Sequence, residues 1–115
     1  MTDRKAIFIT GGAGGMGLET GRYFVQKGWF VGLYDANEAL LAEAARDFNT
    51  GDVVTGCIDV SSESEFGPAV ADFGERSGGR MDVLFNNAGI APGGWFDEMD
   101  TSVLEQTIKV NVLGV

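Results

Sequence analysis

The spacing of hydrophobic and polar residues along this chain predicts strands and helices that alternate. Four apolar runs have the length and composition of strands, and turn residues bound each of them. These predicted strands are residues 5–10, 30–34, 53–58 and 81–86. Helical spacing lies between and after them, in residues 16–27, 38–48, from 62 onward, and 101–115. This alternation, without a linker or an internal repeat, is typical of a single α/β domain with a parallel sheet.

Two of the predicted helices carry mixed signals. Residues 62–65 resemble a capping box, but Gly67 and Pro68 are expected to kink the helix or restart it. In residues 101–115 apolar side chains fall on more than one face, which indicates burial on two sides. The sheet would cover one side, and either missing residues or a second subunit would cover the other. We therefore expect a homo-oligomer that forms through this C-terminal helix.

A cluster of glycines separates the first predicted strand from the first helix. The spacing is Gly11-x-x-x-Gly15-x-Gly17, and two more glycines lie within it. Glycine loses much conformational freedom on folding, so such a cluster indicates positive φ angles or a close approach to the backbone. The N–H groups at the start of the helix can bind an anion. Asp35 ends the second strand 18 residues after Gly17, close to the roughly 20 expected before a ribose-binding carboxylate. The pattern predicts nucleotide binding.

The composition narrows the possible functions. A formal net charge of −9 argues against nucleic acid or an anionic membrane as a partner. No apolar stretch approaches the length of a membrane span and no signal peptide precedes the first strand, so we expect a cytoplasmic protein. The sequence has no histidine, which excludes histidine triads and histidine metal sites, and we predict no metal site. Cys57 lies in an apolar run and is expected to be a buried, inert thiol.

Three motifs occur in a specific order along the chain. Thr10 and the glycines after it read TGxxxGxG, residues 86–89 read NNAG, and Asn111 follows. With these motifs the whole chain resembles the N-terminal half of a short-chain dehydrogenase/reductase, a family of nicotinamide-dependent oxidoreductases. The resemblance implies a Rossmann-type, doubly wound α/β fold with strand order 3-2-1-4 for the portion present. It also implies that residues 1–115 are one dinucleotide-binding domain, truncated before the catalytic half.

The resemblance assigns expected roles to individual residues. It places the cofactor pyrophosphate against the first helix turn, at Gly11, Gly15, Met16 and Gly17. It places the adenine beside Asp59 and Val60. The alternative for Asp59 is an exposed carboxylate at the strand end that does not contact the cofactor. It lines the cofactor cleft with Asn87, Ala88 and Gly89. For the NNAG segment, a purely structural role that bonds neighbouring strands is an equal alternative.

Asp35 bears on the choice of cofactor. A carboxylate at that strand end accepts hydrogen bonds from the ribose 2′-OH and repels a 2′-phosphate. The neighbouring Ala36 and Gly14 leave no arginine ready to hold a phosphate. The sequence therefore predicts NAD rather than NADP.

The catalytic tyrosine and lysine of the family have no counterpart at the matching place in this chain. Of the family's catalytic groups, only the asparagine has a counterpart, which is Asn111. Tyr23 and Lys27 satisfy Tyr-x-x-x-Lys, but they lie in the first helix, upstream of Asn111, where surface roles explain them. Two hypotheses follow. The chain is the cofactor-binding portion of an NAD-dependent oxidoreductase for a small-molecule alcohol or carbonyl substrate, or it is a catalytically inactive nucleotide-binding or interaction module.

The loop of residues 90–98 carries two large aromatic side chains, Trp95 and Phe96. This loop should lie at the carboxyl end of the fourth strand, where ligands bind in parallel sheets. The two aromatic side chains are expected either to wall an apolar substrate or to cover the sheet edge.

Overall fold

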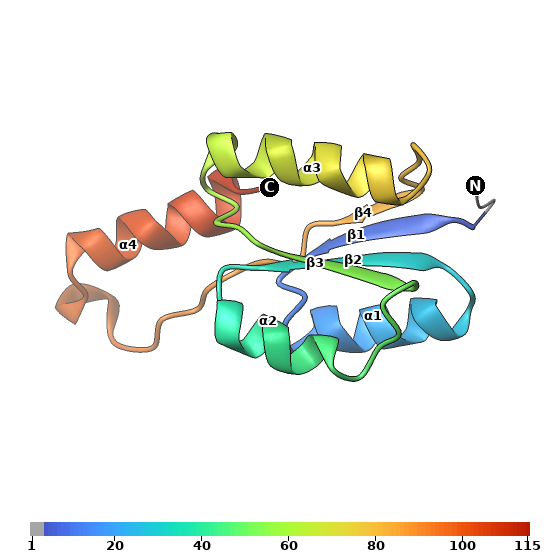
Figure 1. The fold of residues 1–115 in the computed structure, drawn as a ribbon. Helices are drawn as coiled ribbons and strands as arrows, with labels where there is room; N and C mark the ends of the chain where they lie inside the picture. Colours follow the sequence, from blue (N-terminus) through green and yellow to red (C-terminus); the bar gives the residue numbers. More distant parts are fainter. Residues whose placement is uncertain (1–3) are drawn as a thin grey trace.

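The computed structural model describes residues 4–115, which form one parallel sheet with helices on both faces (Figure 1). In chain order the elements are β1 (Ala6–Thr10), α1 (Gly15–Gln26), β2 (Phe30–Asp35), α2 (Glu38–Ala45), β3 (Val53–Cys57), α3 (Glu63–Arg76), β4 (Val83–Phe85), a 3₁₀ turn (Phe96–Glu98), α4 (Thr101–Ile108) and a π-helical stretch (Lys109–Leu113). The sheet order is β3-β2-β1-β4. The predicted Rossmann-type topology is therefore confirmed.

Helices α1 and α2 cover one face of the sheet, and α3 covers the other (Figure 1). Successive strand residues point to opposite faces of the sheet, so β1 contributes side chains to the hydrophobic cluster on each face. Its Ile7 and Ile9 pack in the cluster that contains Leu41 of α2, while Ala6 and Phe8 pack in the cluster that contains Phe73 of α3. Burial on both faces explains why β1 reads as a continuous apolar run rather than an alternating one.

An aromatic cluster holds α3 on the sheet. The ring of Phe8 stacks on that of Tyr34, with centroids 4.2 Å apart, and Phe73 packs edge-on against Phe8 at 5.3 Å. Two strand glycines make room for these rings. A Cβ atom would lie 2.7 Å from the Tyr34 ring at Gly32 and 2.6 Å from it at Gly56. The missing side chains let the rings approach the strand backbone closely.

Strand β3 is only partly buried. Within residues 4–115 it pairs only with β2, so it forms an edge of the sheet and one side of it faces solvent. Val54 and Ile58 are buried, but Thr55 and Cys57 are exposed. The expectation of a buried thiol at Cys57 is therefore wrong. Its Sγ atom lies 3.6 Å from the carbonyl oxygen of Ala36.

Helix α3 runs without interruption past Pro68, so the predicted restart does not occur. The helix instead loses one backbone hydrogen bond, because proline has no N–H. The capping box is also not formed, since the Ser62 side chain makes no cap bond and its hydroxyl lies 3.1 Å from that of Ser64. The Glu65 carboxylate accepts a hydrogen bond from the N–H of Asp59 at 3.3 Å. This glutamate therefore holds the end of β3 rather than the helix start.

The C-terminal segment projects beyond the carboxyl edge of the sheet, and its end returns beside the start of α3 (Figure 1). Its α-helical part ends at residue 108, and the backbone continues in π-helical form. The apolar side chains on one face of this segment form an exposed stripe. Ile108, Val112 and Val115 are 55%, 63% and 71% exposed.

The Tyr34 hydroxyl is unusual within the aromatic cluster. The side chain is only 2% exposed, and its oxygen finds no hydrogen-bond partner within residues 4–115. Burial, with a smaller contribution from the charge of Asp72, raises the pKa of this hydroxyl above its ordinary value. Because the folded state holds this proton more tightly than the unfolded chain, stability falls as the pH rises above about 10, the ordinary tyrosine pKa.

We predict that Tyr34→Phe leaves the free energy of unfolding at neutral pH unchanged or raises it by up to about 1 kcal/mol, because it removes an unpaired buried oxygen. Above about pH 10 the advantage of the variant should widen. Urea unfolding at both pH values measures this, with Tyr23→Phe on the exposed surface of α1 as the control. A variant clearly less stable than the wild type at neutral pH would show that the hydroxyl has a partner.

Candidate functional site

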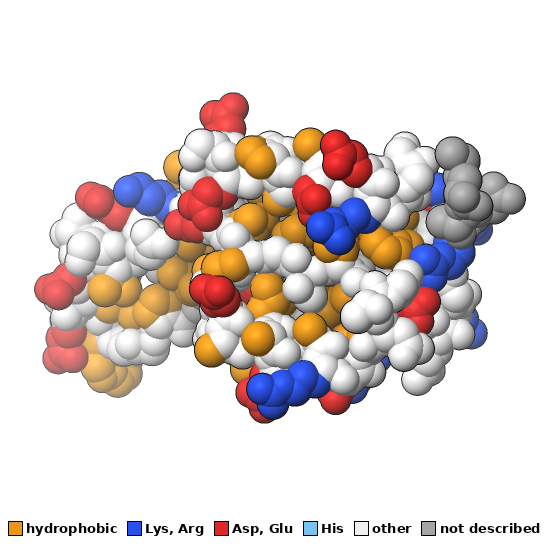
Figure 2. Space-filling model, in the orientation of Figure 1, with side chains coloured by type: hydrophobic (Ala, Val, Ile, Leu, Met, Phe, Trp, Pro, Cys, Tyr) orange, Lys and Arg blue, Asp and Glu red, His pale blue; other side chains and the backbone are white. Residues whose placement is uncertain are grey.

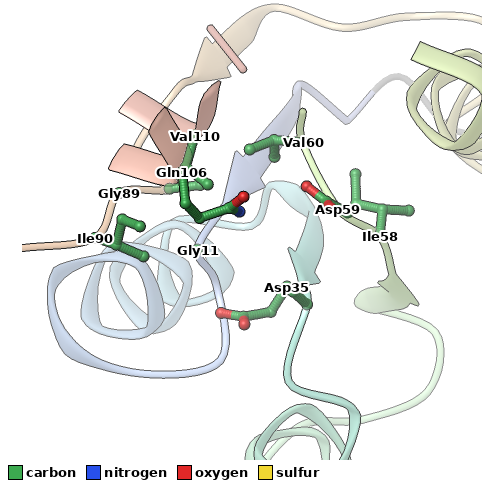
Figure 3. A pocket seen from close by; sticks show the side chains of 11 residues that line it. Gly11, Asp35, Ile58, Asp59, Val60, Gly89, Ile90, Gln106 and Val110 are labelled. Carbon is green, nitrogen blue, oxygen red and sulfur yellow. The ribbon is translucent and has the colours of Figure 1, made fainter. Parts of the chain in front are cut away.

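A cavity of about 240 Å³ opens at the carboxyl edge of the sheet, where all four strands end (Figure 3). Its lining is Gly11 after β1, Asp35 and Ala36 at the end of β2, Ile58, Asp59 and Val60 after β3, Ala88, Gly89 and Ile90 after β4, and Gln106 and Val110 from the C-terminal segment. In open parallel sheets ligands bind at this edge, beside the point where the strand order reverses. Here that point lies between β1 and β4.

The turn between β1 and α1 adopts a backbone that favours glycine. Gly11 and Gly15 have φ angles of +66° and +55°. Helix α1 starts after Gly14 with no side-chain cap and with no acidic residue in its first turn. Its first N–H groups therefore lack intrahelical partners and suit an anion. Gly15 faces open space and Met16 is 77% exposed, so both lie at the surface of this turn and outside the cavity lining.

The NNAG segment fastens the end of β4 to the end of β1. The Thr10 hydroxyl oxygen accepts hydrogen bonds from the N–H groups of Asn87 at 3.1 Å and Ala88 at 3.0 Å. The Asn87 side chain donates to the carbonyl oxygen of Gly11 at 3.2 Å. Asn87 is not part of the cavity lining, whereas Ala88 and Gly89 are. The segment combines the structural bonds with a surface that can contact a ligand.

Gly17 is buried and does not line the cavity. A Cβ atom there would lie 2.7 Å from the side-chain nitrogen of Asn87 and would also meet the carbonyl of Gly11. The bare backbone at this position thus lets the Asn87 amide reach β1. The packing of α1 against the strand depends on it.

Asp35 points into the cavity from the end of β2 (Figure 3). Its Oδ2 atom accepts a hydrogen bond from the N–H of Ala13 at 3.1 Å, and its Oδ1 atom accepts one from the N–H of Asn37 at 3.0 Å. Asn37 caps α2 by accepting a hydrogen bond from the N–H of Leu40 at 3.0 Å. The carboxylate connects the glycine turn to the start of α2. It retains acceptor positions, since a carboxylate offers about four.

Asp59 lines the cavity from the end of β3, beside Val60 (Figure 3). Its Oδ1 atom accepts hydrogen bonds from the Ser61 hydroxyl at 2.6 Å and from the Ser61 N–H at 2.9 Å. These bonds hold the pKa of the Asp59 carboxyl below its ordinary value. Asp59 is therefore a carboxylate at neutral pH, and the cavity carries two negative side chains.

The Asn111 side chain binds the loop after β4 and is not part of the cavity lining. Its Oδ1 atom accepts from the N–H of Ile90, and its Nδ2 atom donates to the carbonyl oxygen of Ile90, both at 2.8 Å. Asn111 lies within the π-helical stretch, a geometry that often occurs at functional sites. These two bonds fix Ile90 in the cavity wall.

The structure adds lining residues that the sequence did not indicate. Gln106 and Val110 lie one helical turn apart, and this spacing is the signal that could have found them. Trp95 and Phe96 are 77% and 76% exposed and lie outside the lining of this cavity, so a role for these rings beside a substrate stays a prediction. The remaining lining positions adjoin predicted residues in the sequence.

The tyrosine and lysine of the first helix lie outside the cavity. The Lys27 ammonium lies over the Tyr23 ring, 5.4 Å from its centroid, on the surface of α1. Within residues 4–115, no cluster of His, Cys, Asp or Glu side chains is placed to hold a metal ion. Of the helices in that range, none has both the length and the hydropathy of a membrane span.

Comparison with known proteins decides the family. The family model for short chain dehydrogenases matches residues 5–115. The chain belongs to the short-chain dehydrogenase family. Short-chain dehydrogenase reductase 5 of Arabidopsis thaliana is 35% identical over 97% of this chain and 43% of its own length. Short-chain dehydrogenase reductase ATA1 of the same plant is 37% identical over 96% of this chain and 40% of its own length.

Solved structures of short-chain dehydrogenases share the fold. The 3-ketoacyl-(acyl-carrier-protein) reductase from Brucella melitensis, complexed with NADH, superposes with a TM-score of 0.90 at 27% identity, over 96% of this chain and 46% of that one. A putative short-chain dehydrogenase from Novosphingobium aromaticivorans gives 0.87 at 26% identity, over 96% and 42%. The chain spans about two fifths of the length of the curated relatives it matches.

We predict that Asp35→Ala loosens the glycine turn even without a ligand, because the N–H of Ala13 loses its acceptor. The free energy of unfolding should fall by about 1.5–3 kcal/mol, the range for a hydrogen bond to a charged group. Asp35→Asn keeps an acceptor oxygen and should lose less. Hydrogen–deuterium exchange at Ala13 and urea unfolding measure both effects, with Asp47→Ala in an exposed ion pair as the control. Equal losses of stability and of exchange protection in the two Asp35 variants would contradict a role of the carboxylate oxygen in holding the glycine turn.

Proposed function

We propose that this chain binds NAD(H) at the carboxyl edge of the sheet and is the cofactor-binding part of an NAD-dependent oxidoreductase. The reaction is hydride transfer between the nicotinamide and a small alcohol or carbonyl substrate. One observation carries the proposal: the cavity is lined by Asp35 and Asp59 and, among the described residues, by no lysine or arginine. Family membership supports the oxidoreductase class, and the NADH complex of the Brucella melitensis relative supports a nicotinamide cofactor.

The residues present fit a dinucleotide. A pyrophosphate suits the uncapped start of α1, where Gly11 and Gly15 keep the backbone bare. The Asp35 carboxylate lies next to that turn and can accept hydrogen bonds from ribose hydroxyls. The cavity is smaller than the roughly 300–1,000 Å³ of typical ligand pockets, so it suits the adenosine end of the cofactor rather than the whole molecule.

Charge favours NAD over NADP. A 2′-phosphate on the ribose would approach the Asp35 carboxylate, and like charges at short range repel. The carboxylate binds the N–H groups of Ala13 and Asn37, and Ala36 beside it in the cavity lining supplies no cation. The 2′-phosphate would therefore lose its hydration without gaining an opposite charge.

The cofactor and the described residues have different roles in the proposed reaction. When bound, the nicotinamide supplies the hydride chemistry. The chain orients the cofactor, because Thr10 fixes the cavity floor at Ala88 and Asn111 fixes the wall at Ile90. A direct catalytic contact by Asn111 stays a prediction, and its two bonds to Ile90 support a positioning role.

A catalytically inactive nucleotide-binding module is the second candidate. The cavity lining contains no tyrosine or lysine among the described residues, so they offer no such proton donor beside the cofactor. Turnover of an alcohol or carbonyl compound by the intact protein distinguishes the two candidates. Cofactor binding without any turnover would favour the module.

We predict that the intact protein binds NADH at least roughly tenfold more tightly than NADPH, a difference of about 1.4 kcal/mol. The reason is repulsion between Asp35 and the 2′-phosphate. Titration followed by the fluorescence of the reduced nicotinamide measures both affinities. Asp35→Asn should narrow the ratio, because it removes the charge at constant shape. Equal or tighter binding of NADPH by the wild type, or binding of neither dinucleotide, would contradict the proposal.

We also propose that the exposed stripe of the C-terminal segment packs against a second copy of the protein. An apolar face of this extent on one helix favours association. The intact protein should sediment as a dimer or larger, and Ile108→Asp should shift it toward the monomer. Tyr23→Asp on α1 is the control, since Tyr23 is equally exposed, at 55%. A monomeric wild type, or an assembly that tolerates Ile108→Asp, would overturn this interface.

A further inference from the structure

The side chain of Gln106 extends from α4 into the cavity (Figure 3). None of the motifs that indicate cofactor binding includes this residue. Within residues 4–115 its amide group forms no side-chain hydrogen bond, although the group can donate and accept. A polar group in a ligand cavity with both functions free can recognise a ligand that carries a donor beside an acceptor.

Gln106 faces the end of β3 across the cavity. Val110 lies one turn further along the same wall, and Ile58, Asp59 and Val60 form the opposite wall (Figure 3). The slot between the two walls is therefore apolar on its faces and polar at Asp59 and Gln106. Asp35, the proposed ribose acceptor, borders this slot from the end of β2.

A nucleobase matches this slot in shape and chemistry. Its flat faces suit Ile58, Val60 and Val110, and its edge needs polar partners. Pyrophosphate oxygens only accept hydrogen bonds, so they would use only the donor of the Gln106 amide. The edge of adenine presents an amino donor beside the N7 acceptor, a pattern that a glutamine amide pairs with through two bonds.

We propose that Gln106 binds the adenine base of the dinucleotide through its side-chain amide and sets base specificity. This inference rests on the proposed function, because it assumes that a dinucleotide occupies the cavity. Asp59 offers only acceptor oxygens, so it cannot pair with a donor and a neighbouring acceptor on the base. The Gln106 amide can, because it carries both a donor and an acceptor. Hypoxanthine carries a carbonyl oxygen where adenine carries the amino group, so at that edge it presents two acceptors and the amide can satisfy only one.

The test titrates the intact protein with NADH and with reduced nicotinamide hypoxanthine dinucleotide. Gln106→Met keeps the length of the side chain but removes the amide. Gln26→Met makes the same change at an exposed position of α1 outside the cavity lining and is the matched control. The wild type should prefer NADH by roughly tenfold, as expected for one or two hydrogen bonds.

Gln106→Met should weaken NADH binding by roughly tenfold and change the affinity for the hypoxanthine analogue by less than about threefold. ADP-ribose, which has the base but no nicotinamide, should lose affinity to the same extent as NADH in calorimetric titration. Gln26→Met should bind all three ligands as the wild type does.

Two results would overturn the inference while the proposed function stands. Unchanged or tighter NADH binding by Gln106→Met would mean that the side chain only fills or blocks the cavity. Equal weakening of both dinucleotides would mean that it contacts the ribose or the phosphates instead of the base. If the wild type binds neither NADH nor NADPH, the proposed function and this inference both fail.

Discussion

The site depends on one buried hydroxyl at the end of β1. Thr10 is 1% exposed, and its oxygen accepts the N–H groups of Asn87 and Ala88 where the strand order reverses. These N–H groups are half-buried, and N–H groups shielded from water without a partner are costly, so this hydroxyl helps to hold the chain where it leaves β4. The Asn87 amide extends the junction to Gly11, and the bare backbone at Gly17 gives it room. Strand β4, the glycine turn and α1 are thereby fixed to one another.

Two further junctions complete the cavity from this base. Asp35 binds the glycine turn and the start of α2 through its two oxygens, and Asn111 binds Ile90 with both ends of its amide. Each wall is thus fixed by hydrogen bonds between segments far apart in the sequence. A site held in this way needs little reorganisation when a ligand enters, which favours tight and selective binding. Its charges then decide which ligand is accepted.

Much of the fold could be predicted because local patterns and the motif order agree. The strands follow from the spacing of apolar residues, and the reversal of strand order follows from the resemblance. The exposure of Cys57 could not be predicted, because an apolar run reads the same in a central strand and in an edge strand. The bonds of Asn111 could not be predicted either, since they join residues 21 positions apart. The spacing of Gln106 and Val110 places both on one helix face, but the sequence does not show that this face borders a cavity.

A crystal structure of the intact protein with NADH tests the proposed cofactor site most directly. We expect the adenosine ribose hydroxyls within hydrogen-bond distance of the Asp35 carboxylate and the pyrophosphate at the first turn of α1. A dinucleotide bound elsewhere, or one whose ribose does not reach Asp35, would contradict it.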